Sequence, residues 1–272
     1  MYAPLTHWIL RTTARGAFPR TRRFIWKRFY NVLSSNWSDP GWRFMNYGWL
    51  PPEPIPGLTT VEEPDRAFIG LYHQAIDGLP LQGARLLEVG SGRGGGAAWM
   101  AGRPSVAGVV GVDLSPRTVA RAARLHEDVP GLDFQVGDAE ALPFTDAGFD
   151  VVVNIESSHC YGSMPRFAGE VARVLRPGGW FSWADMRSPA MLPDLDRAFA
   201  EAGLVLEAER DLTDGVVRAM EATEARKKLN VARFRLVAPL LREFGGMQGS
   251  LIQAALRRRK VVYLARRYRR PG

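Results

Sequence analysis

The sequence predicts an α/β protein with a doubly wound, mostly parallel sheet of seven strands. Two observations carry this prediction. From Ala84 onward, short apolar runs alternate with helical patterns, and this alternation is typical of βαβ units. A glycine-dense turn, Gly90 to Gly96, follows the first apolar run directly. Glycines at such a turn let a ligand approach the backbone, and the N–H groups at the following helix start point outward.

The expected strands are short apolar runs bounded by turn residues. They are residues 84–89, 107–112, 132–136, 149–155, 178–184, 204–209 and 260–265. Helical patterns between the first five strands cover residues 94–102, 116–127 and 164–175. The segment Arg176-Pro177-Gly178-Gly179 closes the last of these as a helix stop and turn. A further helix is expected after Pro193.

Helical and aromatic segments flank this core. Residues 5–35 predict a helical N-terminal extension, and residues 36–64 form a loop rich in Pro, Gly and Trp that is typical of a lid. A helix follows from Pro64 to Gly78, and residues 213–244 predict a helical insertion before the last strand. We therefore divide the chain into an N-terminal extension with an aromatic loop, an α/β core, a helical substrate lid, and a closing strand with a basic tail. These parts cover residues 1–80, 81–210, 211–258 and 259–272.

The composition is that of a globular protein, with 46% apolar and 24% charged residues in a chain of 272. Cys160 is the single cysteine, so an intrachain disulfide is excluded and a reducing compartment is expected. No stretch is long and apolar enough for a transmembrane helix, and basic residues interrupt the N-terminus before a secretory signal could form. We expect a cytoplasmic protein.

The net charge of +8 is concentrated at the two ends of the chain. Residues 1–43 hold eight basic residues against one acid, and residues 257–270 hold eight basic residues and no acid. The middle, which carries the motifs, is acidic. The favoured interpretation is that basic ends wrap or extend an acidic catalytic part. Peripheral contact with an anionic membrane through the basic ends is the second interpretation, and we expect no nucleic-acid partner.

Polar residues follow several predicted strands at the edge where open parallel sheets bind ligands. Asp113 ends the second strand, Gly137-Asp138-Ala139 follows the third, and Asn154-Ile155-Glu156 closes the fourth. A carboxylate at Asp113 suits the two hydroxyls of a ribose, and one at Asp138 suits the amine of adenine. The simplest ligand that satisfies both is a nucleoside-containing cofactor. A dinucleotide is the alternative, but it gives no role to the Gly-Asp-Ala and Leu-Arg-Pro-Gly-Gly segments.

These motifs resemble those of class I S-adenosylmethionine-dependent methyltransferases. The resemblance spans residues 84–185 and rests on motifs in the family's order. They are Glu88-x-Gly90-x-Gly92-x-Gly94, Asp113, Gly137-Asp138-Ala139-x-x-Leu142-Pro143-Phe144, Phe149-Asp150-Val151-Val152 and Leu175-Arg176-Pro177-Gly178-Gly179. The resemblance implies a Rossmann-like fold and S-adenosylmethionine as cofactor, with S-adenosylhomocysteine as product. No metal ion is expected.

The resemblance also implies roles for individual residues. The turn of Gly90, Ser91, Gly92 and Gly94 passes under the methionine carboxylate and the sugar, while Glu88 holds the turn or the cofactor's ammonium group. Asp113 takes the ribose hydroxyls with Leu114 against adenine, and Asp138 with Ala139 takes the adenine edge. Asn154 and Ile155 face the methionine end. Tyr47, in the aromatic loop, is a candidate contact to cofactor or substrate.

A closer resemblance is to the phthiotriol/phenolphthiotriol dimycocerosates methyltransferases, which act on a hydroxyl of a long lipid. It rests on segments throughout the chain, among them Glu63-Pro64-Asp65-Arg66, Asn154 to Tyr161 and Met247-Gln248-Gly249. The implied reaction is O-methylation of an apolar small molecule or lipid, such as a polyketide or other specialised metabolite.

His159 is the candidate general base for such a hydroxyl, because imidazole titrates near neutral pH and the residue follows the fourth strand. Glu156 either orients His159 or holds the cofactor. N- or C-methylation of a natural product stays open, as does a non-methylating cyclase or regulatory protein that binds the same cofactor. A homodimer is compatible with the sequence.

Overall fold

The computed structural model describes residues 42–232, 241–243 and 245–272. The helices expected over residues 5–35 and part of the helical span 213–244 lie outside these residues. Seven strands are present in the described part of the chain. They are β1 (Ala84–Val89), β2 (Val106–Asp113), β3 (Leu132–Val136), β4 (Phe149–Ile155), β5 (Leu175–Arg187), β6 (Val205–Asp211) and β7 (Val262–Arg269).

The strands form one sheet in the order β3-β2-β1-β4-β5-β7-β6. The pairs among β1 to β5 are parallel, and β7 lies antiparallel between β5 and β6. The predicted doubly wound, mostly parallel sheet of seven strands is thereby confirmed. The order of strands reverses between β1 and β4, which places a topological switch point at the carboxyl ends of these two strands.

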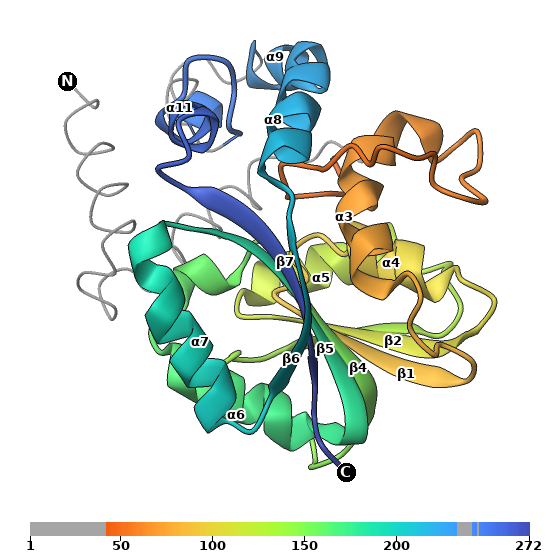
Figure 1. The fold of residues 1–272 in the computed structure, drawn as a ribbon. Helices are drawn as coiled ribbons and strands as arrows, with labels where there is room; N and C mark the ends of the chain where they lie inside the picture. The colour runs from red at the N-terminus through yellow and green to blue at the C-terminus, as the bar shows by residue number, and fades with distance from the viewer. Residues whose placement is uncertain (1–41, 233–240, 244) are drawn as a thin grey trace.

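The described helices cover both faces of the sheet and one of its ends. They are α3 (Arg66–Ile76), α4 (Gly95–Ala101), α5 (Pro116–Leu125), α6 (Met164–Val174), α7 (Leu192–Glu201), α8 (Thr213–Ala222), α9 (Glu224–Ala232) and α11 (Leu251–Arg257), with short 3-10 turns η1 (Glu63–Asp65), η2 (Ser158–Cys160) and η3 (Pro189–Met191). Figure 1 shows α6 and α7 on one face, α3 and α4 on the other, and α8, α9 and α11 grouped beyond one end of the sheet.

The core consists of two apolar clusters, one on each face of the sheet. Consecutive residues of a strand enter opposite clusters, because side chains alternate across a pleated strand. On β1, Leu86 belongs to the cluster with α3 and α4, whereas Leu87 and Val89 belong to the cluster with α6 and α7. Strands buried on both faces explain why the sequence shows apolar runs here rather than alternation.

Two of the strands, β5 and β7, extend at least three residues beyond one of their predicted ends. β5 begins at Leu175, so the segment Arg176 to Gly179 belongs to the strand and does not form a separate turn after α6. β7 continues to Arg269, so most of the expected basic tail is part of the sheet. Arginine is tolerated there because buried Arg266 pairs with Asp196 and Glu209.

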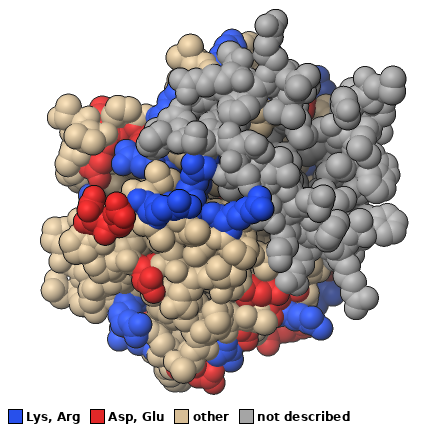
Figure 2. All heavy atoms as spheres, turned by 180° about the vertical axis from the view of Figure 1, so that it is seen from behind, with Lys and Arg blue, Asp and Glu red and all other residues tan. Residues whose placement is uncertain are grey.

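Charge on the described surface is mixed. Figure 2, which views the molecule from behind, shows Lys and Arg side chains gathered near the centre of that face, with acidic side chains around them. Among the described residues, no helix has both the length and the apolar character needed to cross a membrane.

Candidate functional site

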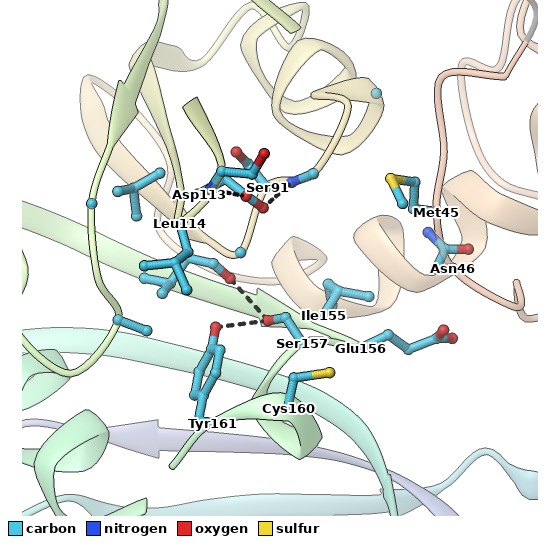
Figure 3. A pocket seen from close by; sticks show the side chains of 18 of the residues that line it. Met45, Asn46, Ser91, Asp113, Leu114, Ile155, Glu156, Ser157, Cys160 and Tyr161 are labelled. Atoms are coloured by element: carbon cyan, nitrogen blue, oxygen red, sulfur yellow. Dashed lines mark hydrogen bonds between the residues drawn. The ribbon is translucent and has the colours of Figure 1, made fainter. Parts of the chain in front are cut away.

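A pocket opens at the switch point, beyond the carboxyl ends of β1, β2 and β4. Its empty volume is about 1020 Å³, counting its open mouth. It is lined by nine residues that the sequence predicts for the site: Gly90, Ser91, Gly92, Asp113, Leu114, Asp138, Ala139, Ile155 and Glu156. Five others do not reach its wall: Tyr47, Glu88, Gly94, Asn154 and His159. Figure 3 shows Ser91 and Asp113 on one side of the pocket, with Glu156 and Cys160 on another.

The glycine turn between β1 and α4 passes close to other parts of the chain. Gly90 has a φ of 78°, and a Cβ on it would lie 2.4 Å from Ser157 Oγ. Gly94 has a φ of 80°, and its Cβ would lie 2.4 Å from Phe134 Cζ. Side chains are excluded at both positions by the left-handed backbone and by the contacts. Gly90 therefore allows Ser157 to pack against the turn at the pocket wall, and Gly94 allows Phe134 to pack against the turn at the start of α4.

Asp113 holds the glycine turn as well as lining the pocket. Its Oδ2 accepts a hydrogen bond from Gly92 N at 3.1 Å, and its Oδ1 accepts one from Ser115 N at 2.9 Å. Burial raises the pKa of Asp113, and these two N–H donors oppose the rise. A carboxylate oxygen can accept more than one hydrogen bond, so both oxygens retain capacity for hydroxyl donors. The residue fits a ribose.

Asp138 and Ala139 line the pocket beyond β3. The Asp138 carboxylate accepts a hydrogen bond from Glu140 N at 3.0 Å, which makes a local turn. Leu114 and Ile155 supply apolar wall to the same pocket. An acidic group next to apolar walls is the chemistry that a purine with an exocyclic amine requires.

Glu88 lies beneath the pocket and not on its wall. Its Oε1 accepts a hydrogen bond from Tyr72 OH at 2.8 Å, and Tyr72 is one of the residues that line the pocket. Burial raises the pKa of Glu88 to about 8, against the lowering effect of this hydrogen bond. This contact ties Glu88 to α3, while its Oε2 is buried without a hydrogen-bond partner among the described residues, so the two roles expected for Glu88 stay predictions.

Asn154 organises a small polar cluster at the end of β4. Its buried Nδ2 reaches Val89 O at 2.9 Å, Ser157 Oγ at 2.7 Å and Tyr161 OH at 3.0 Å. Ser157 and Tyr161 line the pocket, and the sequence analysis missed them. Their position in the segment that carries Glu156 and His159 is the signal that could have identified them.

Glu156 joins the aromatic loop to the end of β4. Its carboxylate accepts hydrogen bonds from Tyr47 N at 2.8 and 3.0 Å and from Tyr263 OH at 3.0 Å. Its φ of 44° is uncommon for a residue with a side chain and costs about 1–3 kcal/mol. Burial raises the pKa of Glu156 to about 7, while the hydrogen bonds from Tyr47 and Tyr263 oppose this.

Asp185, at the carboxyl end of β5, is the partner of His159. His159 Nδ1 lies 2.8 Å from Asp185 Oδ1, and His159 N donates to Asp185 Oδ2 at 2.9 Å. The orienting role considered for Glu156 therefore belongs to Asp185 in this geometry. The sequence analysis missed Asp185, although a polar residue after a buried apolar run is the same signal that identified Asp113.

The surroundings of Asp185 keep it ionised. It is fully buried, accepts a hydrogen bond from Ser158 Oγ at 2.7 Å, and pairs with Arg187 at 3.0 Å. Burial alone would raise the pKa of Asp185, but His159 and Arg187 outweigh it and the pKa falls. Burial lowers the pKa of His159, but the Cys160 sulfur and the Asp185 carboxylate outweigh it, and the pKa rises well above its usual value. His159 is next to Cys160, which lines the pocket.

The Asp65 carboxylate connects α9 to the pocket wall. Asp65, buried at the start of α3, pairs with Arg43 at 3.1 Å and with Arg226 at 2.6 Å. Arg43 lines the pocket, and its carbonyl oxygen accepts from Gly95 N at 3.2 Å. Arg226 belongs to α9. The glycine turn, the aromatic loop and α9 are thus connected through a few polar contacts.

The fold and this pocket define an S-adenosylmethionine-dependent methyltransferase, and comparison with known proteins agrees. Residues 87–183 match the model of the family described as a methyltransferase domain. The phthiotriol/phenolphthiotriol dimycocerosates methyltransferase of Mycobacterium leprae is 36% identical over 244 residues, covering 88% of this chain and 89% of that protein. The chain belongs to this family of methyltransferases.

Other relatives differ in the reactions their names state. The fatty-acid O-methyltransferase of Mycolicibacterium smegmatis is 41% identical over 197 residues, covering 72% of this chain and 71% of that protein. Among solved structures, the [4+2]-cyclase SpnF has a TM-score of 0.70 at 20% identity, covering 92% and 97% of the two chains. A geranyl diphosphate C-methyltransferase of Streptomyces coelicolor, solved with S-adenosylhomocysteine, has a TM-score of 0.67 at 18% identity, covering 90% and 97%. These two structures share the fold.

Proposed function

We propose that the protein transfers the methyl group of S-adenosylmethionine to a hydroxyl oxygen of an apolar small molecule or lipid. The observation that carries this proposal is the His159–Asp185 pair, held at 2.8 Å beside the cofactor pocket. The lipid and fatty-acid acceptors in the names of the relatives support an apolar acceptor. Buried Met220 and Met247 in the lid region, with Tyr47 next to them, also support it.

The residues on the pocket wall hold the cofactor in this proposal. Asp113 accepts the ribose hydroxyls, Asp138 and Ala139 receive the adenine edge, and the open glycine turn passes under the methionine end. Tyr47 and Glu156 act together, since the Glu156 carboxylate fixes the main chain of the aromatic loop. When bound, S-adenosylmethionine supplies an electrophilic methyl group on a positively charged sulfur.

His159 takes the proton of the acceptor hydroxyl in this proposal. A hydroxyl is a poor nucleophile until a base removes its proton. Because Asp185 engages Nδ1, proton transfer goes through Nε2, and the buried carboxylate stabilises the imidazolium that forms. The side chains of His159 and Asp185 are largely buried, which limits the access of water to this pair.

His159→Ala and Asp113→Ala test the two halves of the proposal. With a long-chain alcohol as acceptor, we expect His159→Ala to lose about a hundredfold to ten-thousandfold in turnover while it still binds S-adenosylmethionine. Asp113→Ala should weaken cofactor binding about tenfold to a hundredfold, measured by calorimetry. His73→Ala replaces a half-buried histidine that packs against Trp99 and does not line the pocket; as the control it should change neither quantity. Full turnover by His159→Ala would exclude the general-base role.

Product analysis separates the alternative reactions. Mass spectrometry and NMR of the product tell O-methylation from N- or C-methylation by the position of the added methyl group. A protein that binds S-adenosylmethionine but yields no methylated product with any acceptor would instead be a cyclase or a regulatory protein of this fold.

A cytoplasmic location, a homodimer and peripheral membrane contact through the basic chain ends belong to the same proposal. The apolar acceptor supports membrane contact, since such a molecule partitions into lipid. Sedimentation with anionic vesicles at increasing salt tests it, because electrostatic attachment weakens as salt rises.

A further inference from the structure

Lys227 on α9 carries a buried ammonium group that the methyltransferase reaction described above does not use. Its Nζ is buried and has no hydrogen-bond partner among the residues that the structure describes. The nearest recorded contact is the ring of Tyr47, with Nζ 5.9 Å from the ring centroid. A buried charge without a direct partner is unfavourable, so its presence calls for a ligand or a function.

Two carboxylates act on Lys227, and neither forms a hydrogen bond with its Nζ, although Glu224 Oε1 also lacks a hydrogen-bond partner in the described part of the chain. Glu156 accepts hydrogen bonds from Tyr47 N and Tyr263 OH. Glu224 accepts one from Gln248 N at 3.0 Å and pairs with Lys228 at 3.5 Å. Burial lowers the pKa of Lys227 to about 8, and these two carboxylates oppose the fall, so the ammonium group is still mostly protonated at neutral pH. The two carboxylates therefore attract the Lys227 ammonium group electrostatically, but neither of them forms a hydrogen bond with it.

Lys227 lies beside the ring of Tyr47, a residue whose main chain is bonded to the wall of the cofactor pocket. The ring of Tyr47 packs near Gly246, and Met220 lies against the same glycine. The main chain of Tyr47 is bonded to Glu156, which lines the pocket. A buried cation that lacks a hydrogen-bond partner among the residues described, beside an aromatic ring and next to the methyl-transfer site, matches the chemistry of a carboxylate on a long hydrocarbon chain.

We propose that Lys227 binds a carboxylate of the methyl acceptor and thereby selects an acceptor that carries an acid group on an apolar chain. This rests on the proposed function, since it places the acceptor between the lid and the cofactor pocket. If the carboxylate is itself methylated, an O–CH₃ bond forms as the S–CH₃ bond breaks. The electron pair of that bond stays on sulfur, and no proton has to be removed. If a hydroxyl of the same molecule is methylated, its proton goes to His159.

The test compares hexadecanoic acid with hexadecanol, which has the same chain without the acid. Binding is measured by tryptophan fluorescence in the presence of S-adenosylhomocysteine. In the wild type we expect the acid to bind more tightly than the alcohol. Lys227→Met should lower this preference about tenfold to a hundredfold, because a charged hydrogen bond is lost. Lys227→Arg should restore part of it, and Lys260→Met, which removes an exposed lysine away from the site, should leave the preference as in the wild type.

Two results would overturn the proposal: a wild type that binds the alcohol as tightly as the acid, or a preference unchanged in Lys227→Met. The melting temperature of each variant shows whether that variant is folded. If Lys227→Met is unstable, the preference for acid over alcohol is measured in Lys227→Arg instead. The proposed function is tested separately in the same samples, by cofactor binding and by whether an ester, an ether or no methylated product forms.

Discussion

Among single residues, the buried carboxyl groups of Glu88, Glu156 and Asp185 differ in charge because, of these three, Asp185 has cationic side chains within bonding distance. Burial raises the pKa of Glu88 to about 8 and that of Glu156 to about 7, and both receive hydrogen bonds only from neutral groups. Asp185 faces His159 and Arg187, and its pKa falls. Asp185 is thus the permanent negative charge of the site, which suits it to support an imidazolium.

The pH dependence of methyl transfer to a hydroxyl should report the His159–Asp185 pair. A base must be neutral to act, so kcat/KM should rise with pH through the raised pKa of His159. Asp185→Asn removes a charge that raises this pKa, so the rising limb should move to lower pH, with lower kcat because the imidazolium loses its counter-charge.

Asp194→Asn is the control for this pH profile, since Asp194 is exposed and pairs with Arg197 on α7. Its profile should superimpose on that of the wild type. An unchanged rising limb in folded Asp185→Asn would assign the ionisation to another group.

At the level of elements, the packing of α3 against α4 depends on one glycine. A Cβ on Gly96 would lie 1.9 Å from the ring of Tyr72, whose hydroxyl donates to Glu88. Gly96→Ala should therefore lower the free energy of unfolding by about 1–3 kcal/mol or more through overpacking. It should also weaken cofactor binding, because Tyr72 lines the pocket. Urea unfolding and calorimetry measure the two effects.

Gly169→Ala on α6 is the matched control for this substitution. Gly169 is also helical, but no atom lies within 4 Å of the position its Cβ would take. Alanine there should raise the free energy of unfolding by about 0.4–1 kcal/mol, because it restricts the unfolded chain. If both substitutions had the same effect, helix propensity and not the contact with Tyr72 would explain the first result.

The elements of the core could be predicted because each depends on neighbouring residues. The alternation of apolar runs and helical patterns gave all seven strands, and Ser115 caps α5 as its place before Pro116 suggests. The ends of β5 and β7 were predicted less well. From the sequence alone, the arginines of β7 predict an exposed basic tail. They can belong to a strand because Arg266 pairs with Asp196 and Glu209, which lie far away in the chain.

In the candidate site, too, residues that follow a local sequence pattern could be predicted, whereas contacts between distant parts of the chain could not. Gly90 and Asp113 stand directly after strands, and the sequence places them on the pocket wall. The contacts of Tyr72 with Glu88, of Asp185 with His159 and of Asp65 with Arg226 join residues that lie 16, 26 and 161 positions apart. Such pairings depend on how elements pack, and no local pattern contains them.

Over the whole molecule, the fold uses much of the C-terminal basic charge. Arg266 lies buried between two carboxylates, Arg267 donates to Gln74 O at 2.7 Å, and Arg269 lies 4.6 Å from the Trp180 ring centroid. Arg257 and Arg259 form ion pairs with residues of α8 and β6. A membrane contact through basic residues would therefore depend more on residues 1–43 than on this end of the chain.

Deletion of residues 262–272 distinguishes a structural strand from a basic tail. β7 joins β5 to β6, and it buries Tyr263, Leu264 and Tyr268. Large apolar side chains contribute roughly 1.5–3 kcal/mol each when buried, and total stability is roughly 5–15 kcal/mol, so the shortened chain should not fold cooperatively. Deleting only Pro271 and Gly272, which are exposed, should leave the melting temperature and cofactor binding unchanged. A cooperative thermal transition in the longer deletion would show that the sheet is stable without its last strand.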